Sequence, residues 1–126
     1  MGRGSLKGKR VLVVEDEFLI AFDLRRALAA LDADVVGPVS NLAAGMALVD
    51  AERVDAAVLD VNLCGTMSFP LADRLTEAGV PIMFVTGYDD WALPDHYAQT
   101  PRIAKPFAYA DVVGMVQEIC SPGAGP

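Results

Sequence analysis

Four short apolar segments of this 126-residue chain each end in side chains that could do chemistry. The segments end in three carboxylates, one carboxylate, a hydroxyl and an ammonium, in that order: Glu15, Asp16 and Glu17, then Asp60, Thr86 and Lys105. Carboxylates that crowd together repel one another, so several can stay ionised only if a cation neutralises them. Oxygen ligands with access to water suit Mg²⁺, and a carboxylate nucleophile beside a metal, a cation and a hydroxyl is suited to accept a phosphoryl group. These residue types therefore indicate phosphoryl chemistry, provided that the fold brings them together.

Other metal and redox sites have weaker support. His96 is the only histidine, so the sequence has no His/Cys cluster suited to zinc. The two cysteines, Cys64 and Cys120, form neither a disulfide framework nor a Cys-x-x-Cys motif. Such cysteine usage favours the reduced cytoplasm.

The elements that must position these side chains alternate along the chain. The predicted strands are 11–14, 35–36, 56–59, 81–85 and 102–104, and the predicted helices are about 17–31, one capped by Ser40, about 69–78, and one that carries 112–119. This alternation predicts an α/β domain, a doubly wound five-stranded parallel sheet with helices on both faces. In such a sheet the functional crevice lies at the carboxyl ends of the strands. Pro94 and Pro101 predict an irregular segment over 87–101, where a fourth helix would otherwise stand.

Four segments, each at a predicted strand end, resemble the motifs of a response-regulator receiver domain. They are residues 11–17 (VLVVEDE), 58–63 (VLDVNL), 84–87 (FVTG) and 105–107 (KPF). The resemblance covers roughly residues 9–119 and implies the flavodoxin-like fold of CheY-like receivers. Residues 81–88 (PIMFVTGY) also resemble the motif of a receiver subclass called FATGUY, from which Ile82 and Val85 depart mildly.

The resemblance implies a role for each acidic residue of the candidate site. Asp60 corresponds to the phosphoacceptor, which the phosphohistidine of a sensor kinase modifies. Glu15 and Asp16 correspond to the acidic pair that holds Mg²⁺, directly or through water. Asn62 corresponds to the position whose backbone carbonyl completes the metal shell, so Mg²⁺ is the expected cofactor.

The resemblance also concerns the response to phosphorylation. Thr86 and Lys105 correspond to the residues that contact the phosphoryl oxygens and link phosphorylation to loop movement. Receivers usually carry an aromatic switch residue three positions before the lysine, where this sequence has Arg102. Tyr88 lies nearby in the sequence and is a candidate substitute. The sequence leaves open whether Arg102 abolishes the switch or replaces it.

Composition sets the expected domain limits and excludes several classes of protein. The formal net charge is −7, whereas DNA binding requires a basic face. The sequence has no apolar run near the roughly 18 residues that a membrane span needs. Residues 1–8 and 121–126 are rich in Gly or Pro and are expected to be flexible tails, which leaves 9–120 as one receiver domain in the cytoplasm.

The expected function is that of a stand-alone receiver. Its partners would be a sensor histidine kinase, of the HWE type by the subclass resemblance, or a phosphotransfer protein, together with an unknown downstream protein. It is not expected to be an enzyme beyond slow phosphorylation and dephosphorylation of itself. One alternative is a pseudo-receiver that binds partners without being phosphorylated. Another is an Mg²⁺-dependent hydrolase with Asp60 as covalent nucleophile, but Asn62 stands where its acid/base carboxylate would be needed.

Overall fold

A five-stranded parallel sheet forms the centre of the computed structural model, which describes residues 5–87 and 93–121. The strands lie in the order β2-β1-β3-β6-β7. Their bounds are β1 Arg10–Val14, β2 Asp34–Val39, β3 Ala56–Asp60, β6 Ile82–Thr86 and β7 Arg102–Ala104. The helices are α1 Phe18–Ala29, α2 Leu42–Ala51, α3 Phe69–Glu77 and α4 Tyr109–Cys120. This arrangement confirms the predicted doubly wound α/β fold.

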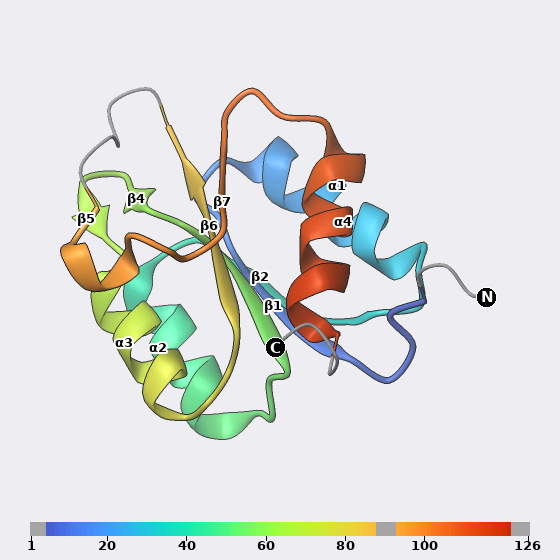
Figure 1. Cartoon of the computed structure of the whole chain (residues 1–126), viewed down its shortest axis with the longest axis horizontal. Coiled ribbons are helices and arrows are strands. Elements are labelled where there is room, and N and C mark those ends of the chain that lie inside the picture. Colours follow the sequence, from blue (N-terminus) through green and yellow to red (C-terminus); the bar gives the residue numbers. More distant parts are fainter. Residues whose placement is uncertain (1–4, 88–92, 122–126) are drawn as a thin grey trace.

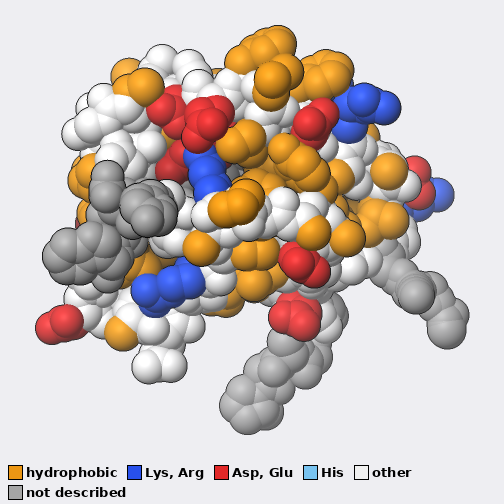
Figure 2. Space-filling model, turned by 90° about the horizontal axis from the view of Figure 1, so that it is seen from above, with side chains coloured by type: hydrophobic (Ala, Val, Ile, Leu, Met, Phe, Trp, Pro, Cys, Tyr) orange, Lys and Arg blue, Asp and Glu red, His pale blue; other side chains and the backbone are white. Residues whose placement is uncertain are grey.

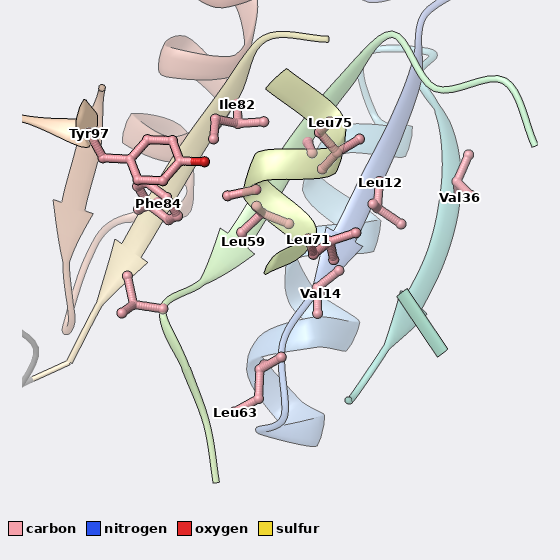
Figure 3. Close-up of a cluster of buried hydrophobic side chains, with 13 residues drawn as sticks. Leu12, Val14, Val36, Leu59, Leu63, Leu71, Leu75, Ile82, Phe84 and Tyr97 are labelled. Carbon is pink, nitrogen blue, oxygen red and sulfur yellow. The ribbon is translucent and has the colours of Figure 1, made fainter. Parts of the chain in front are cut away.

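Two helices cover each face of the sheet (Figure 1). α1 and α4 pack on one face and α2 and α3 on the other, so the core is divided into two clusters by the sheet. Figure 3 shows the cluster under α3, in which Leu71 and Leu75 lie against Leu12, Leu59 and Phe84 of the strands. Such a sheet is buried on both sides, and its strands therefore have continuous apolar runs.

Local sequence explains where the elements on the α2 side begin and how closely they pack. Asn41 caps α2, because its side-chain oxygen accepts a hydrogen bond of 2.8 Å from the backbone N–H of Ala44. The prediction that Ser40 is this cap is therefore wrong by one residue. Gly45 lets α2 approach α3, since a Cβ at this position would lie 2.7 Å from Cδ2 of Leu71.

The segment before β7 is irregular in its described part, as predicted. A single turn of 3-10 helix, η1 Asp95–Tyr97, stands where a regular helix would otherwise lie. Tyr97 is buried and meets Phe84 edge-on, with 5.2 Å between the ring centroids (Figure 3). Its hydroxyl donates a hydrogen bond of 2.5 Å to Asp73 on α3. His96 also lies 3.3 Å from the same carboxylate oxygen, so two neighbouring side chains fix the turn to α3.

Arg102 binds the backbone of the same turn. Its guanidinium donates to the backbone carbonyls of Tyr97 and Ala98, at 2.8 and 2.9 Å. The residue at the expected switch position therefore binds main chain in this structure. Tyr88, the candidate substitute, lies outside the described residues.

Two features of the fold were not predicted. A short antiparallel hairpin, β4 Asn62–Leu63 and β5 Thr66–Met67, follows β3. Leu6 falls in the expected N-terminal tail, but it is buried in the core between the sheet and α1, and its N–H donates to the carbonyl of Leu31 at 2.8 Å. The packed structure therefore begins by Leu6 and not at residue 9. Within the described ranges, the helices are too short or too polar to cross a membrane.

Candidate functional site

The candidate side chains meet at the carboxyl edge of the sheet. Glu15 follows β1, Asp60 ends β3, Thr86 ends β6 and Lys105 follows β7. Neighbouring parallel strands end at the same edge, so groups far apart in the sequence lie together here. Figure 2, which views the molecule from above, shows acidic side chains gathered around a basic one on this face.

Lys105 is the centre of the charge network. Its Nζ donates to Oε2 of Glu15 at 3.0 Å, to Oδ2 of Asp60 at 3.0 Å and to Oε2 of Glu17 at 2.6 Å. Glu15 and Asp60 are buried, whereas the Glu17 side chain is 58% exposed. One ammonium therefore pairs with two buried carboxylates and with a third at the rim, and its single charge cannot neutralise them all.

Backbone N–H groups fix the two buried carboxylates. The N–H of Glu17 donates to Oε2 of Glu15 at 3.0 Å, and the N–H of Asn62 donates to Oδ1 of Asp60 at 3.1 Å. The side chain of Asn62 accepts a hydrogen bond of 2.6 Å from the N–H of Gly65, which closes the hairpin turn. The segment after Asp60 is therefore ordered as a hairpin, which was not predicted.

Burial dominates the electrostatics of the site. It raises the pKa of Glu15 to about 8, although hydrogen bonds from Glu17 N–H and Lys105 oppose the rise. It also raises the pKa of Asp60 above its ordinary value, against the hydrogen bond from Lys105. For Lys105, burial lowers the pKa, but hydrogen bonds to the three carboxylates outweigh it, so the net pKa is raised. The ammonium stays charged, and the buried carboxylates are short of positive charge.

The donor set fits Mg²⁺. Oxygens of Glu15, Asp16 and Asp60 lie within 4.8 Å of one another. Oε1 of Glu15 is buried and has no hydrogen-bond partner among the described residues, and such an atom is satisfied by a cation. Three carboxylates and open access for water match the ligands that Mg²⁺ prefers.

A cleft of about 700 Å³ opens beside these groups, lined by Asp60, Lys105 and the neighbouring loops. Thr86 is not turned toward it. The Thr86 hydroxyl donates weakly, at 3.5 Å, to the carbonyl of Ile103 on β7, while its own carbonyl accepts the N–H of Lys105 at 2.9 Å. The structure therefore brings the carboxylates and Lys105 together and leaves Thr86 beside them, bonded to the neighbouring strand.

Two residues at the mouth of the cleft were given no role from the sequence. Glu17 pairs with Lys105, and the thiol of Cys64 donates to Oδ2 of Asp16 at 2.9 Å. For Asp16, burial raises the pKa, but hydrogen bonds, first the one from Cys64, outweigh it and lower the pKa. The available signals were the position of Glu17 next to the acidic pair and the position of Cys64 in the loop four residues after Asp60.

Comparison with known proteins agrees with this geometry. The transcriptional activator protein IrlR of Burkholderia pseudomallei (strain 1026b) is 30% identical over 122 residues, which cover 90% of this chain and 51% of IrlR. The chain spans about half or less of the length of the first curated relatives that it matches.

Solved structures agree as well. The solution structure of SdrG from Sphingomonas melonis Fr1 is 38% identical, with a TM-score of 0.75, and covers 84% of this chain and 91% of that one. The PhyR receiver domain of Erythrobacter litoralis is 24% identical, with a TM-score of 0.76 over 98% of this chain and 95% of that one, and shows the fold alone. Residues 11–117 match the family described as the response regulator receiver domain. The chain therefore belongs to the receiver domain family of response regulators, signalling proteins of two-component systems.

Proposed function

We propose that this domain accepts a phosphoryl group on Asp60 from the phosphohistidine of a sensor histidine kinase or a phosphotransfer protein. The observation that carries the proposal is the Lys105–Asp60 ion pair of 3.0 Å beside a cluster of carboxylates, at the edge of an open cleft. A second solution structure of SdrG, which is 34% identical over 94% of this chain, is described as the BeF3-activated conformation, and beryllofluoride mimics a phosphoryl group on a carboxylate. Hydrolase chemistry has less support, because Asn62 offers no acid/base carboxylate beyond Asp60.

The proposed transfer uses the groups that surround Asp60. A carboxylate oxygen of Asp60 forms a bond to phosphorus while the phosphorus–nitrogen bond of the donor breaks. The donor imidazole leaves with the bonding electron pair and takes up a proton from solvent. Lys105 pairs with the phosphoryl oxygens, and the Thr86 hydroxyl turns from β7 toward them. When bound, Mg²⁺ would neutralise the charge of the transferred group, and its ligands would be Glu15, Asp16, Asp60 and the backbone carbonyl of Asn62.

The surface beside the site supports docking of a protein donor. Phe18 and Leu19, on the first turn of α1, are 77% and 72% exposed. Phe22 stacks on Phe18 with 6.3 Å between ring centroids, and the guanidinium of Arg25 lies 5.4 Å from the Phe22 ring. An exposed apolar patch of this kind is typical of a protein interaction site. In the proposal, the kinase or phosphotransfer protein binds α1 and presents its phosphohistidine to the cleft.

We also propose that the domain acts alone in the cytoplasm and signals by contact with a downstream protein. SdrG supports the stand-alone form, because the match covers 91% of the solved SdrG chain. Residues 81–88 support membership of the FATGUY subclass, and with it a kinase of the HWE type, although Tyr88 lies outside the described residues. We propose one receiver domain that runs from about Leu6, which is buried in the core, to residue 120.

Intact-mass analysis tests the phosphorylation. The protein is incubated with acetyl phosphate or phosphoramidate, with Mg²⁺ or with chelator, and compared with Asp60→Asn. Asp34→Asn is the matched control, because Asp34 lies at the amino edge of the sheet, where it pairs with Arg10. A single phosphoryl adduct that needs both Mg²⁺ and Asp60 is expected. No adduct, together with no Asp60-dependent binding of beryllofluoride, would contradict the proposal and favour the pseudo-receiver.

A further inference from the structure

Glu17 occupies an unusual place between α1 and the cleft. It stands at the N-cap position of α1, but its side chain caps no N–H group in the described structure. Instead its Oε2 lies 2.6 Å from Nζ of Lys105, closer than either buried carboxylate at 3.0 Å. Because the side chain is largely exposed, this contact draws the ammonium toward the mouth of the cleft.

The pairing leaves the mouth of the cleft negative. In the described structure the single ammonium of Lys105 pairs with the carboxylates of Glu15, Glu17 and Asp60, and Asp16 lies beside Glu15 and Asp60. When all four carboxylates are ionised, this ammonium and a bound divalent cation together still leave an excess of negative charge. Of these four, Glu17 is the one outside the cluster of Glu15, Asp16 and Asp60 whose oxygens lie within 4.8 Å of one another. Its carboxylate therefore adds repulsion at the rim without adding a buried ligand.

We propose that Glu17 is a specificity-determining residue that disfavours small, highly charged phosphodonors. The inference rests on the proposed phosphorylation of Asp60. A free acyl phosphate is a dianion. To reach Asp60 it must pass the Glu17 carboxylate, which lines the cleft, and replace Glu17 as the partner of the Lys105 ammonium. A phosphohistidine carried by a protein docked on α1 has additional contacts that offset the same repulsion. Glu17 thus favours a protein donor over free metabolites.

The expected effect is moderate because Glu17 is exposed. Charges a few ångströms apart near a protein surface interact weakly, so removing one should change a rate about two- to fivefold. The effect should scale with the charge of the donor. Acetyl phosphate is a dianion at neutral pH, whereas phosphoramidate is a monoanion of similar size, and the pair of donors therefore separates repulsion from a general change in the site.

The experiment compares the wild type with Glu17→Gln and with Glu118→Gln, each in Mg²⁺ at low and at higher ionic strength. Glu118 is exposed on α4 and its substitution removes the same charge. Phosphorylation rates are measured with both donors. Glu17→Gln should raise the rate with acetyl phosphate about two- to fivefold and the rate with phosphoramidate less than twofold. Added salt should reduce the difference, and Glu118→Gln should match the wild type.

A second readout needs neither metal nor phosphoryl donor. In the metal-free protein, Glu17→Gln should shift the NMR signals of the Lys105 side chain, and Glu118→Gln should leave them in place. Equal changes with both donors, a fall in both rates, or an unmoved Lys105 signal would each overturn the inference while leaving the phosphorylation of Asp60 intact. Absence of an adduct in the wild type with both donors, together with no Asp60-dependent binding of beryllofluoride, would overturn the inference together with the proposed function.

Discussion

Replacing Glu15 by Gln should stabilise the metal-free protein. The carboxylate is buried, and its Oε1 lacks a hydrogen-bond partner within the described residues, while Oε2 accepts from the Glu17 N–H and from Lys105. Glutamine keeps one oxygen to accept these hydrogen bonds. Its NH₂ group can then donate toward the carboxylate of Asp60, which faces Glu15 across the site. Glutamine is neutral at every pH, so folding no longer requires the site either to take up a proton or to hold two like charges side by side.

The size of the effect follows from the pKa of Glu15. The folded value is about 8 and the ordinary value is 4.5, so between these values the folded protein binds a proton that the unfolded chain has lost. The free energy of unfolding therefore decreases as pH rises from about 4.5 to about 8. At about 1.4 kcal/mol per pKa unit, the raised pKa of Glu15 lowers the free energy of unfolding at pH 7 by about 3 kcal/mol. Glu15→Gln should recover about 2 kcal/mol of this loss, because burial of a neutral amide also has a cost.

Urea denaturation in chelator, at steps from pH 5 to pH 9, measures this directly. The free energy of unfolding of the wild type should decrease as pH rises, and that of Glu15→Gln should depend less on pH. At pH 7 the variant should be more stable by about 2 kcal/mol, or about 6–10 °C in melting temperature. Glu118→Gln, which removes an exposed charge, controls for net charge. A wild-type curve that is flat or rises over this range, or a variant that is less stable throughout, would refute the reasoning.

Three further substitutions test the packing around the site. Arg102→Ala should raise hydrogen exchange in the 3-10 turn by about tenfold, because two hydrogen bonds to backbone carbonyls are lost; exchange unchanged from wild type would count against this anchor. Tyr97→Phe should lower the free energy of unfolding by about 1–2 kcal/mol, since the carboxylate of Asp73 loses the hydroxyl donor, and calorimetry showing equal stability would contradict it. Gly45→Ala should cost about 1–3 kcal/mol in urea denaturation because of the 2.7 Å approach to Leu71, and a neutral result would mean that α3 yields easily.

The sheet and its carboxyl edge could be predicted because the information is local. Residues 56–59 form a continuous apolar run that ends at Asp60, which is typical of a buried parallel strand, and the position of the functional edge follows from parallel strands. Pro94 and Pro101 likewise predicted the irregular segment, since proline cannot continue a helix. The candidate site followed from the same reasoning, as far as which residues share the edge.

The pairings within the site could not be predicted in this way. The contact of Glu17 with Lys105 joins residues separated by 88 positions, and it depends on how the loop after β7 is placed. Arg102 binds main-chain carbonyls, which every residue has, so its partners leave no pattern in the sequence. Leu6 is a single apolar residue between polar ones, too short for periodicity to show its burial.

The hydrogen bonds of Arg102 to the carbonyl oxygens of the 3-10 turn have an evolutionary consequence. A guanidinium that donates hydrogen bonds to backbone carbonyls does not depend on the side chains of the residues that it binds. Apart from the buried ring of Tyr97, the outward-facing positions of this turn can therefore diversify while their scaffold stays in place. Homologues that retain the arginine and the tyrosine could present different chemical surfaces at one location, and so acquire new binding specificities without redesigning the fold.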